Sequence, residues 1–158
     1  MKDKLIFKSV TEIAELIRTK KVSPVELTKE LIQHAKETDQ IINVFMTIQE
    51  EEALKQAKEA EKEIQDGHYK GMYHGIPIAI KDNIYTTDMP TTMSSKIHEN
   101  YTPNYEATVV QKLKDAGAII FGKVSMHEYA WGITNDNPHY GPVKNPWKLE
   151  HIPGGSSG

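Results

Sequence analysis

A lysine at the end of an apolar run is the first residue of this sequence that is placed to do chemistry. Lys81 directly follows residues 76–80, all of which are apolar. An ammonium group is rarely buried without a partner, and burial favours the neutral amine, which can accept a proton. Lys81 is therefore a candidate general base. From this feature alone an alternative stays open, in which the side chain reaches solvent or pairs with the neighbouring Asp82.

A glycine- and serine-rich segment at residues 154–158 is the second candidate. Its glycines would bring backbone amides close to a ligand and leave the hydroxyl of Ser156 free to point into a pocket. Such glycine clusters usually lead into a helix or line a pocket, so we expect a chain that ends here to be truncated. A flexible tail or a cloning scar has the same composition and is the alternative.

Residue type and spacing exclude several other sites. His127 and Glu128 begin like the zinc-protease pattern H-E-x-x-H, but position 131 is tryptophan. The seven histidines are scattered and there is no cysteine, so we predict no metal site and no cysteine nucleophile. The glycine segment also lacks the Gly-Lys-Ser/Thr ending of a phosphate-binding loop, which argues against nucleotide binding.

Composition is that of one globular domain or part of a larger one, with 158 residues of which 38% are hydrophobic. The net charge of −3 argues against a nucleic-acid or anionic-membrane partner, because neutralising phosphates requires a surplus of lysine and arginine. Residues 1–8 carry positive charge, but their apolar run is too short for a signal peptide or a membrane span. Together with the absence of cysteine, this predicts a cytoplasmic protein.

Helix starts are marked by capping residues. Residues 9–12 and 23–26 each combine a serine cap with a glutamate three positions later, and each leads into apolar residues at helical spacing. Residues 50–65 are rich in Glu, Lys and Ala, which predicts an exposed helix that stops at Gly67.

Strand composition appears in three further segments. Residues 42–48 are rich in β-branched and aromatic side chains, and residues 76–80 and 118–121 are the continuous apolar runs of buried strands. Residues 107–116 predict a helix between the last two, and residues 132–158 have the Gly, Pro, Asn and Ser content of an ordered loop. The alternation of helix and apolar strand predicts an α/β fold.

Taken together, the chain resembles the amidase signature family over most of its length. The matching stretches are residues 75–83, 108–113, 117–123, 126–128, 145–147 and 153–158. The resemblance implies the N-terminal portion of the amidase signature fold, with a mixed β-sheet core covered by helices. Residues 1–158 would then be the N-terminal part of a single amidase domain, truncated within the Gly/Ser-rich signature.

The resemblance assigns roles by position. Lys81 matches the family's general base, and Ser156 matches the serine that bridges this lysine and the nucleophile. Their separation of 75 residues, 156 − 81, also matches. The resemblance implies a cis peptide bond between Gly155 and Ser156, and neither a metal nor an organic cofactor. The family's nucleophilic serine lies further downstream, so we expect this chain alone to be inactive. No other serine takes the role of nucleophile in the resemblance, because these serines match different parts of the family's pattern: Ser94, Ser95, Ser125 and Ser157.

The activity that the resemblance implies is hydrolysis of a non-peptide carboxamide, with a small-molecule amide as substrate. Residues 132–138 approach the substrate pocket in the family, which makes four of them candidates for substrate binding: Thr134, Asn135, Asp136 and Asn137. Asn and Asp are also ordinary turn formers. Residues 133–138 look closer to stand-alone amidases than to the amidotransferase subunit that releases ammonia from glutamine for tRNA-dependent amidation. The alternatives are a glutaminase fragment of that amidotransferase kind, a non-catalytic remnant and a partner-dependent fragment.

The strands near residues 76 and 118 are expected to belong to a larger sheet. Their exposed edges would favour aggregation, which predicts poor solubility or a molten state for the isolated chain. The sequence predicts neither the oligomeric state nor which amide is the substrate.

Overall fold

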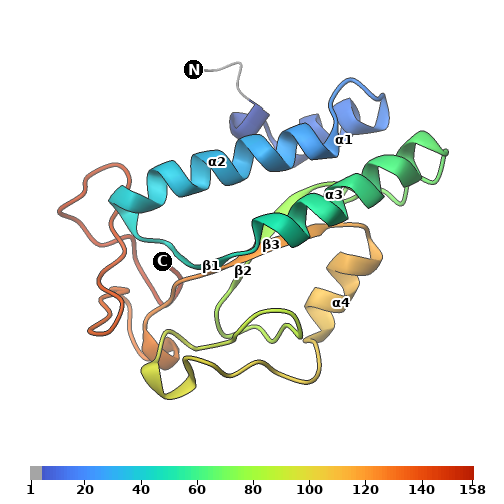
Figure 1. Cartoon of the computed structure of the whole chain (residues 1–158). Coiled ribbons are helices and arrows are strands. Elements are labelled where there is room, and N and C mark those ends of the chain that lie inside the picture. The colour runs from blue at the N-terminus through green and yellow to red at the C-terminus, as the bar shows by residue number, and fades with distance from the viewer. Residues whose placement is uncertain (1–4) are drawn as a thin grey trace. The chain divides into compact units, whose positions relative to one another are not determined.

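The computed structural model of the chain describes residues 5–158. Helices and strands alternate along these residues as predicted for an α/β fold (Figure 1). The elements are α1 Val10–Arg18, α2 Pro24–Ile42, β1 Phe45–Ile48, α3 Glu50–Gln65, β2 Pro77–Lys81, α4 Thr108–Asp115 and β3 Ile119–Val124, with short 3-10 helices at Leu5–Phe7, Lys96–His98 and Glu128–Ala130.

The chain folds as two compact units. Unit 1 contains the described residues up to His34, together with Gln49–Ile78 and Gln111–Phe121. Unit 2 contains Ala35–Ile48, Ala79–Val110 and Gly122–Gly158. Helices α2 and α4 and strands β2 and β3 each begin in one unit and end in the other.

The strands form a mixed sheet in the order β1-β3-β2. Strand β1 is antiparallel to β3, with Phe45 opposite Val124. The backbone bonds at the two ends of β2 and β3 run in the same sense, from Ile119 N to Ile76 O (2.9 Å) and from Asp82 N to Val124 O (3.0 Å). These two strands are therefore parallel, and α4 lies in the crossover between them.

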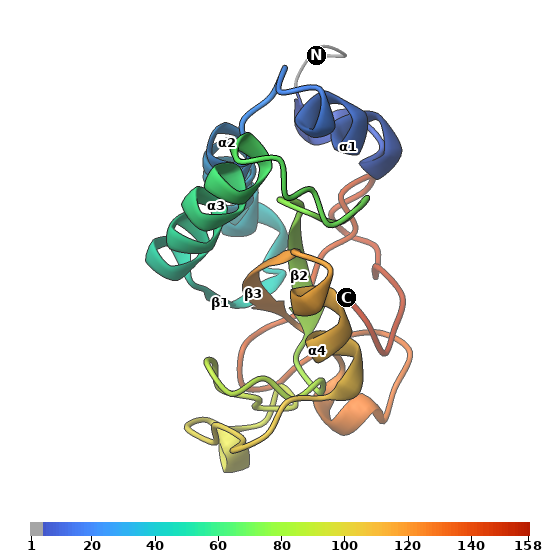
Figure 2. The ribbon, with the colours of Figure 1, turned by 90° about the vertical axis from the view of Figure 1, so that its right-hand side faces the viewer.

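Unit 1 is built around an aliphatic core. Ile13 and Ile17 of α1, Leu27 of α2, Ile64 of α3 and Ile76 at the start of β2 form one buried cluster. Figures 1 and 2 show the first half of α2 beside α3. Helices α1 and α2 contribute apolar residues at the helical spacing that their sequences predict.

Both predicted capping segments begin helices. Ser9 Oγ accepts a hydrogen bond from Glu12 N (3.3 Å), and the Glu12 carboxylate accepts one from Ser9 N (2.8 Å), which completes a capping box at the start of α1. Ser23 Oγ accepts from the backbone N–H groups of Val25 (3.0 Å) and Glu26 (3.2 Å) at the start of α2. These side chains satisfy donors that have no partner inside the helix.

Helix α3 has the predicted bounds, but it is not exposed on all sides. Ala53, Ala57, Ala60 and Ile64 recur at helical spacing and are buried. Small alanine side chains let this face approach its neighbours closely, so burial is possible without the large apolar residues on which the prediction of an exposed helix relied.

Strand β1 starts three residues later than predicted. Helix α2 continues to Ile42, and Asn43 then adopts a positive φ of 57°. The Asp39 carboxylate accepts hydrogen bonds from the backbone N–H groups of Val44 (2.6 Å) and Phe45 (2.8 Å). Asparagine tolerates the left-handed conformation that ends a helix, and Asp39 holds the exit of the chain toward β1.

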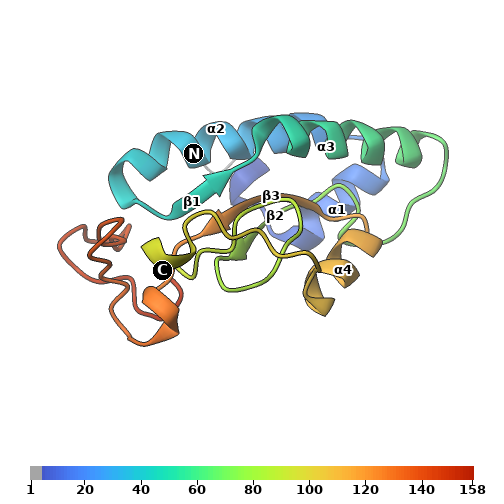
Figure 3. The same cartoon turned by 60° about the horizontal axis from the view of Figure 1, so that its bottom comes forward.

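Long loops make up much of unit 2. Figure 3 shows residues 82–107, drawn from yellow-green to yellow, and residues 125–158, drawn from orange to red. The predicted loop at residues 132–158 contains no helix or strand, and Ser157 forms an isolated β-bridge with Met126.

Within residues 5–158, no helix is long and apolar enough to cross a membrane. The prediction that residues 1–8 are not a signal peptide falls partly on residues 1–4, which lie outside the described residues. The assignment of residues 1–158 to one truncated amidase domain stays a prediction.

Candidate active site

Lys81 and Ser156 are in direct contact in unit 2. Lys81 is the last residue of β2, and its Nζ donates a hydrogen bond to Ser156 Oγ at 2.7 Å. Both side chains are half-buried. A distance of 2.7 Å is short enough for a proton to move between the two groups. Of the alternatives left open by the sequence, the structure therefore favours a partnered lysine, and the partner is the predicted serine.

The backbone around Ser156 contains a cis peptide bond and pairs with the residues that follow β3. The peptide bond between Gly155 and Ser156 is cis, as the resemblance implied. His127 N donates to Ser156 O (2.8 Å), and Ser157 pairs with Met126 in the β-bridge. The glycine-rich segment is thus held against the residues that follow β3.

Gly155 lies at a close backbone contact. A Cβ atom built at this position would lie 2.6 Å from the carbonyl carbon of Ile133 and 2.9 Å from Gly132 O. Only glycine fits there, so the glycine before Ser156 has a packing role.

The carboxylate of Asp82, the residue after Lys81, is fully buried. It accepts hydrogen bonds from Thr92 N (3.2 Å) and Ser94 N (3.0 Å), and it forms a short contact with Thr92 Oγ1. Asp82 is therefore bound to the loop at residues 92–94, whereas Lys81 is directed at Ser156. The two neighbouring charged side chains therefore have different partners: Lys81 contacts Ser156, and Asp82 holds the loop.

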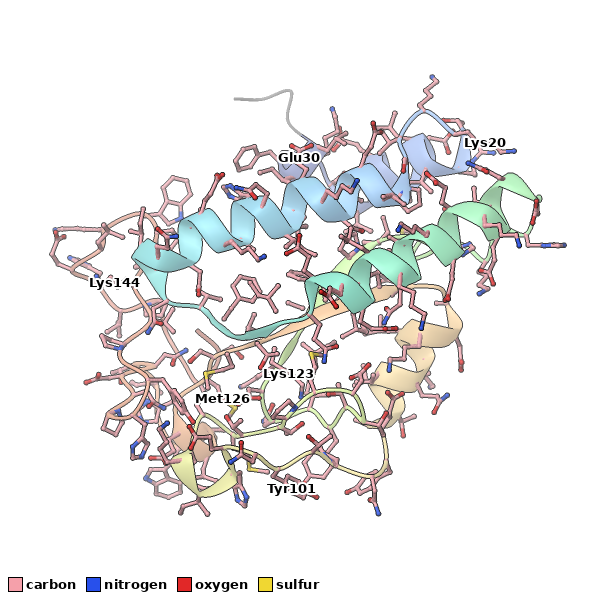
Figure 4. All side chains as sticks on the ribbon, viewed as in Figure 1. Lys20, Glu30, Tyr101, Lys123, Met126 and Lys144 are labelled. Carbon is pink, nitrogen blue, oxygen red and sulfur yellow. The ribbon has the colours of Figure 1, made fainter. Side chains whose placement is uncertain are left out.

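Lys123 on β3 is a buried charge that sequence reasoning missed (Figure 4). Its Nζ donates to Ile84 O (2.6 Å) and Thr91 Oγ1 (2.8 Å). Burial lowers the pKa of Lys123, and attraction to the carboxylates of Asp82 and Asp88 opposes this effect. The net result is a pKa of about 8. The available signal was a lysine two residues after the apolar run predicted as a strand at residues 118–121.

Asn135 and Asn137, two of the four candidate substrate-binding residues, have buried amides that bind the protein itself. With its amide turned to suit its neighbours, Asn135 donates to Met126 O (3.1 Å) and accepts from Gly158 N (2.7 Å). Asn137 donates to Ser94 O (2.7 Å). These contacts give both asparagines a part in holding the loops around Ser156.

Thr134 and Asp136, the other two candidates, line a surface pocket of about 320 Å³. Val143, Lys144 and His151 are among its further lining residues. Neither Lys81 nor Ser156 belongs to this lining. A role of the four residues in substrate binding stays a prediction.

In the described part of the chain, no three His, Cys, Asp or Glu side chains are arranged to hold a metal ion. The groups that the structure brings together here are an amine, hydroxyls and backbone amides. Such groups can transfer protons and orient a hydroxyl.

A family model described as "Amidase" matches residues 26–158. The A subunit of glutamyl-tRNA(Gln) amidotransferase from Carboxydothermus hydrogenoformans is 44% identical over 154 residues, which cover 98% of this chain and 32% of that protein.

Solved amidase structures share the fold. The peptide amidase from Stenotrophomonas maltophilia matches with a TM-score of 0.89 and 29% identity, over 96% of this chain and 32% of that one. A fatty acid amide hydrolase matches with a TM-score of 0.89 and 30% identity, over 95% of this chain and 26% of that one. The chain spans about a third of the length of the relatives that it matches.

Proposed function

The chain belongs to the amidase family, and from this premise we propose that it supplies the general base and the bridging serine of a site that hydrolyses carboxamides. The observation that carries the proposal is the 2.7 Å contact between Lys81 Nζ and Ser156 Oγ. Lys81 has the role of base, and Ser156 passes the proton.

The proposed reaction begins with neutral Lys81, which accepts the proton of Ser156 Oγ. Ser156 in turn takes the proton of a nucleophilic serine, whose oxygen attacks the amide carbonyl carbon. The C–N bond breaks, the amine leaves with a proton, and water later cleaves the acyl ester. In the family the nucleophile lies downstream of the glycine-rich segment, so we assign it to no residue of this chain and expect the chain alone not to hydrolyse amides.

The substrate class has two candidates. The first is a small carboxamide, as in stand-alone amidases, supported by the resemblance of residues 133–138. The second is the side-chain amide of glutamine, favoured by the 44% identity to the glutamyl-tRNA(Gln) amidotransferase protein. Hydrolysis rates with glutamine and with simple aliphatic and aromatic amides discriminate between them. No metal, no organic cofactor and a cytoplasmic location remain predictions from the sequence.

A chimera tests the proposal. This chain replaces the matching third of the Carboxydothermus relative, and ammonia release is measured with glutamine and a panel of amides. We expect activity in the chimera, and a loss of about 10²- to 10⁴-fold in kcat when Lys81→Ala removes the base. Lys81→Arg keeps the charge but cannot act as a base, so the loss should be similar. Ser156→Ala should also inactivate the enzyme.

Lys58→Ala is the matched control, because Lys58 is exposed on α3. This variant should retain the rate of the chimera. An inactive chimera beside an active relative would support the reading of a non-catalytic remnant. Full activity in Lys81→Ala would remove Lys81 from the mechanism.

A further inference from the structure

We propose that Ser94 is a positioning residue that holds the segment bearing Ser156 in register with Lys81. This inference rests on the proposed function, because it assigns Ser94 a part in the Lys81–Ser156 contact. Ser94 contacts neither of these side chains in the hydrogen bonds of unit 2. It acts through the residues next to each of them.

On the lysine side, Ser94 is bound to Asp82, the residue after Lys81. Ser94 N donates to the Asp82 carboxylate (3.0 Å), and Met93 N donates to Asp82 O (3.1 Å). Thr92 N donates to the same carboxylate (3.2 Å). The loop at residues 92–94 is therefore fixed to the end of β2 through both the side chain and the backbone of one residue.

On the serine side, Ser94 Oγ accepts a hydrogen bond from Met126 N (3.1 Å). Met126 forms the β-bridge with Ser157, and the next residue, His127, donates its N–H to Ser156 O (2.8 Å). Ser94 is thus hydrogen-bonded on both sides, to Asp82 at the end of β2 through its N–H and to the segment that pairs with Ser156 through its hydroxyl. Figure 4 marks Met126, which follows β3.

The carbonyl of Ser94 makes a third contact. It accepts from the buried amide of Asn137 (2.7 Å). The N–H, the C=O and the hydroxyl of Ser94 are all engaged, and the residue is fully buried. A buried group that loses its partner is costly, so removal of the hydroxyl leaves Met126 N–H without its acceptor and should loosen the backbone after β3.

The backbone conformation of Ser94 supports this reading. Met93 and Ser94 are consecutive non-glycine residues with positive φ, 54° and 50°. Side chains other than glycine rarely adopt this conformation, and it persists where the surrounding structure imposes it. Glycine would adopt this positive φ with less strain than serine. A serine here, with three buried hydrogen bonds, indicates that its hydroxyl contributes to holding the surrounding backbone.

Ser95 provides a matched control. It is also fully buried and one position away, but its Oγ accepts only a long bond from Ile97 N (3.4 Å) at the start of the 3-10 helix Lys96–His98. Ser94→Ala and Ser95→Ala therefore remove the same atom from the same loop. Of these two serines, only Ser94 is hydrogen-bonded, through Met126 N, to the segment that pairs with the backbone of Ser156.

Hydrogen exchange in the chimera tests the link without any need for activity, because the chimera supplies the rest of the sheet that the isolated chain lacks. We expect Ser94→Ala to speed amide exchange at Met126, which loses its acceptor, and at His127, which is bound to Ser156. Ser95→Ala should leave both amides as protected as in the parent. If Ser94→Ala accelerates Met126 alone, or neither amide, the link to Ser156 is refuted.

Kinetics in the chimera test the consequence. Misplacing the bridging serine should lower kcat by about 10- to 100-fold in Ser94→Ala, with KM within about twofold of the parent, because positioning affects the chemical step. Ser94→Gly also lacks the hydroxyl but relieves the positive φ, so it should be more stable than Ser94→Ala and equally slow. A rate that recovers in Ser94→Gly would mean that stability, rather than position, limits turnover, and would overturn the proposal.

The two measurements keep the proposals apart. If Lys81→Ala retains activity, the proposed function fails, whereas the exchange result still decides whether Ser94 holds the backbone of Ser156. If Lys81→Ala is inactive but Ser94→Ala and Ser95→Ala have equal kcat, only the inference on Ser94 fails.

Discussion

Lys123 is a fully buried lysine whose ammonium group has two oxygen partners, Ile84 O and Thr91 Oγ1. Moving a charge out of water is unfavourable, and these bonds offset only part of that cost. The attraction of Asp82 and Asp88 opposes the effect of burial, but it does not cancel it, because the pKa of Lys123 is still lowered to about 8. Protonated Lys123 therefore disfavours the folded state relative to the neutral amine.

This predicts that the chain gains stability as the pH rises above about 8. Between that value and the ordinary lysine pKa of 10.5, the unfolded chain binds the proton and the folded chain does not, so raising the pH favours folding. Denaturant unfolding of the chimera at a series of pH values, with and without the Lys123 substitution, should show the gain. Lys123→Met should abolish this part of the pH dependence, and Lys58→Met should leave it unchanged. Identical pH profiles for the parent and Lys123→Met would contradict the prediction.

His74 in unit 1 predicts a second pH dependence, at lower pH. Its ring is fully buried, Nδ1 accepts a hydrogen bond from Lys70 N (3.1 Å), and Nε2 lies 2.9 Å from the Glu63 carboxylate. Burial lowers the pKa of His74 below 6.5, and repulsion from Lys70 adds to this, against the attraction of Glu63. An imidazolium could not accept the bond from Lys70.

Stability should therefore fall as the pH drops below about 6.5, because the unfolded chain takes up the proton first. Unfolding of the chimera, followed by circular dichroism at pH values between about 7 and 5.5, covers this window while Glu63, whose pKa is lowered mainly by its bond to Lys70, stays ionised. His74→Gln should flatten the dependence, and His68→Gln at an exposed site should not. A parent chain whose stability is constant over this range would be inconsistent with a buried neutral ring.

At the scale of single residues, the sequence predicted the contacting pair but not its surroundings. Lys81 and Ser156 were identified from a strand end, a glycine segment and a family resemblance, and they are hydrogen-bonded across 75 residues. Asp82 and Ser94 could not be paired in this way, because their contact depends on how an irregular loop returns to the strand end. Loop paths of this kind have no periodic signal in the sequence.

At the scale of elements, local rules worked where the signals are local. The caps at Ser9 and Ser23 predicted the starts of α1 and α2, and the glycine after α3 predicted its end. The start of β1 was missed because Ile42 is equally suited to a helix and a strand. The side chain of Asp39, three residues earlier, decides where the helix ends.

Strand β3 contains a glycine that allows the close pairing with β1. Gly122 lies opposite Ile48, and a Cβ atom at Gly122 would come within 2.4 Å of Thr47 O. Gly122→Ala should therefore push the strands apart and destabilise the chain by about 1–3 kcal/mol, as other overpacked sites do. Denaturant unfolding of the chimera with and without the substitution gives the change in free energy, and amide exchange along β1 locates the effect. A change of less than about 0.5 kcal/mol would mean that the sheet adjusts without cost.

At the scale of the whole molecule, the chain aligns with only part of each relative that it matches. It spans about a third of the length of its relatives, and β1 and β2 form the edges of its three-stranded sheet. Strand edges present unpaired backbone groups that favour aggregation, so the expected poor solubility of the isolated chain has a physical cause. The sequence predicted the N-terminal part of the amidase signature fold. It did not predict that β2 and β3 would each contribute residues to both compact units.

Exposed tryptophans give a whole-molecule test of this view. Trp131 and Trp147 in unit 2 are 89% and 95% exposed, and Ile133 is 76% exposed. Large apolar side chains in such positions often mark a surface that another part of a protein covers. In the isolated chain, the fluorescence maximum should be close to that of free tryptophan and should change little on unfolding. In the chimera, we expect the added two-thirds of the relative to cover this surface and shift the emission to shorter wavelength.

The relative's own tryptophans are removed from this comparison by difference spectra. Subtracting the spectrum of the Trp131→Phe chimera from that of the parent chimera isolates Trp131, and Trp147→Phe isolates the second residue. A blue-shifted difference spectrum for at least one of them supports a covered surface. If both difference spectra match free tryptophan in a chimera that hydrolyses amides, these side chains face solvent in the active protein, and the exposed surface of unit 2 has no role in joining the chain to the rest of the enzyme.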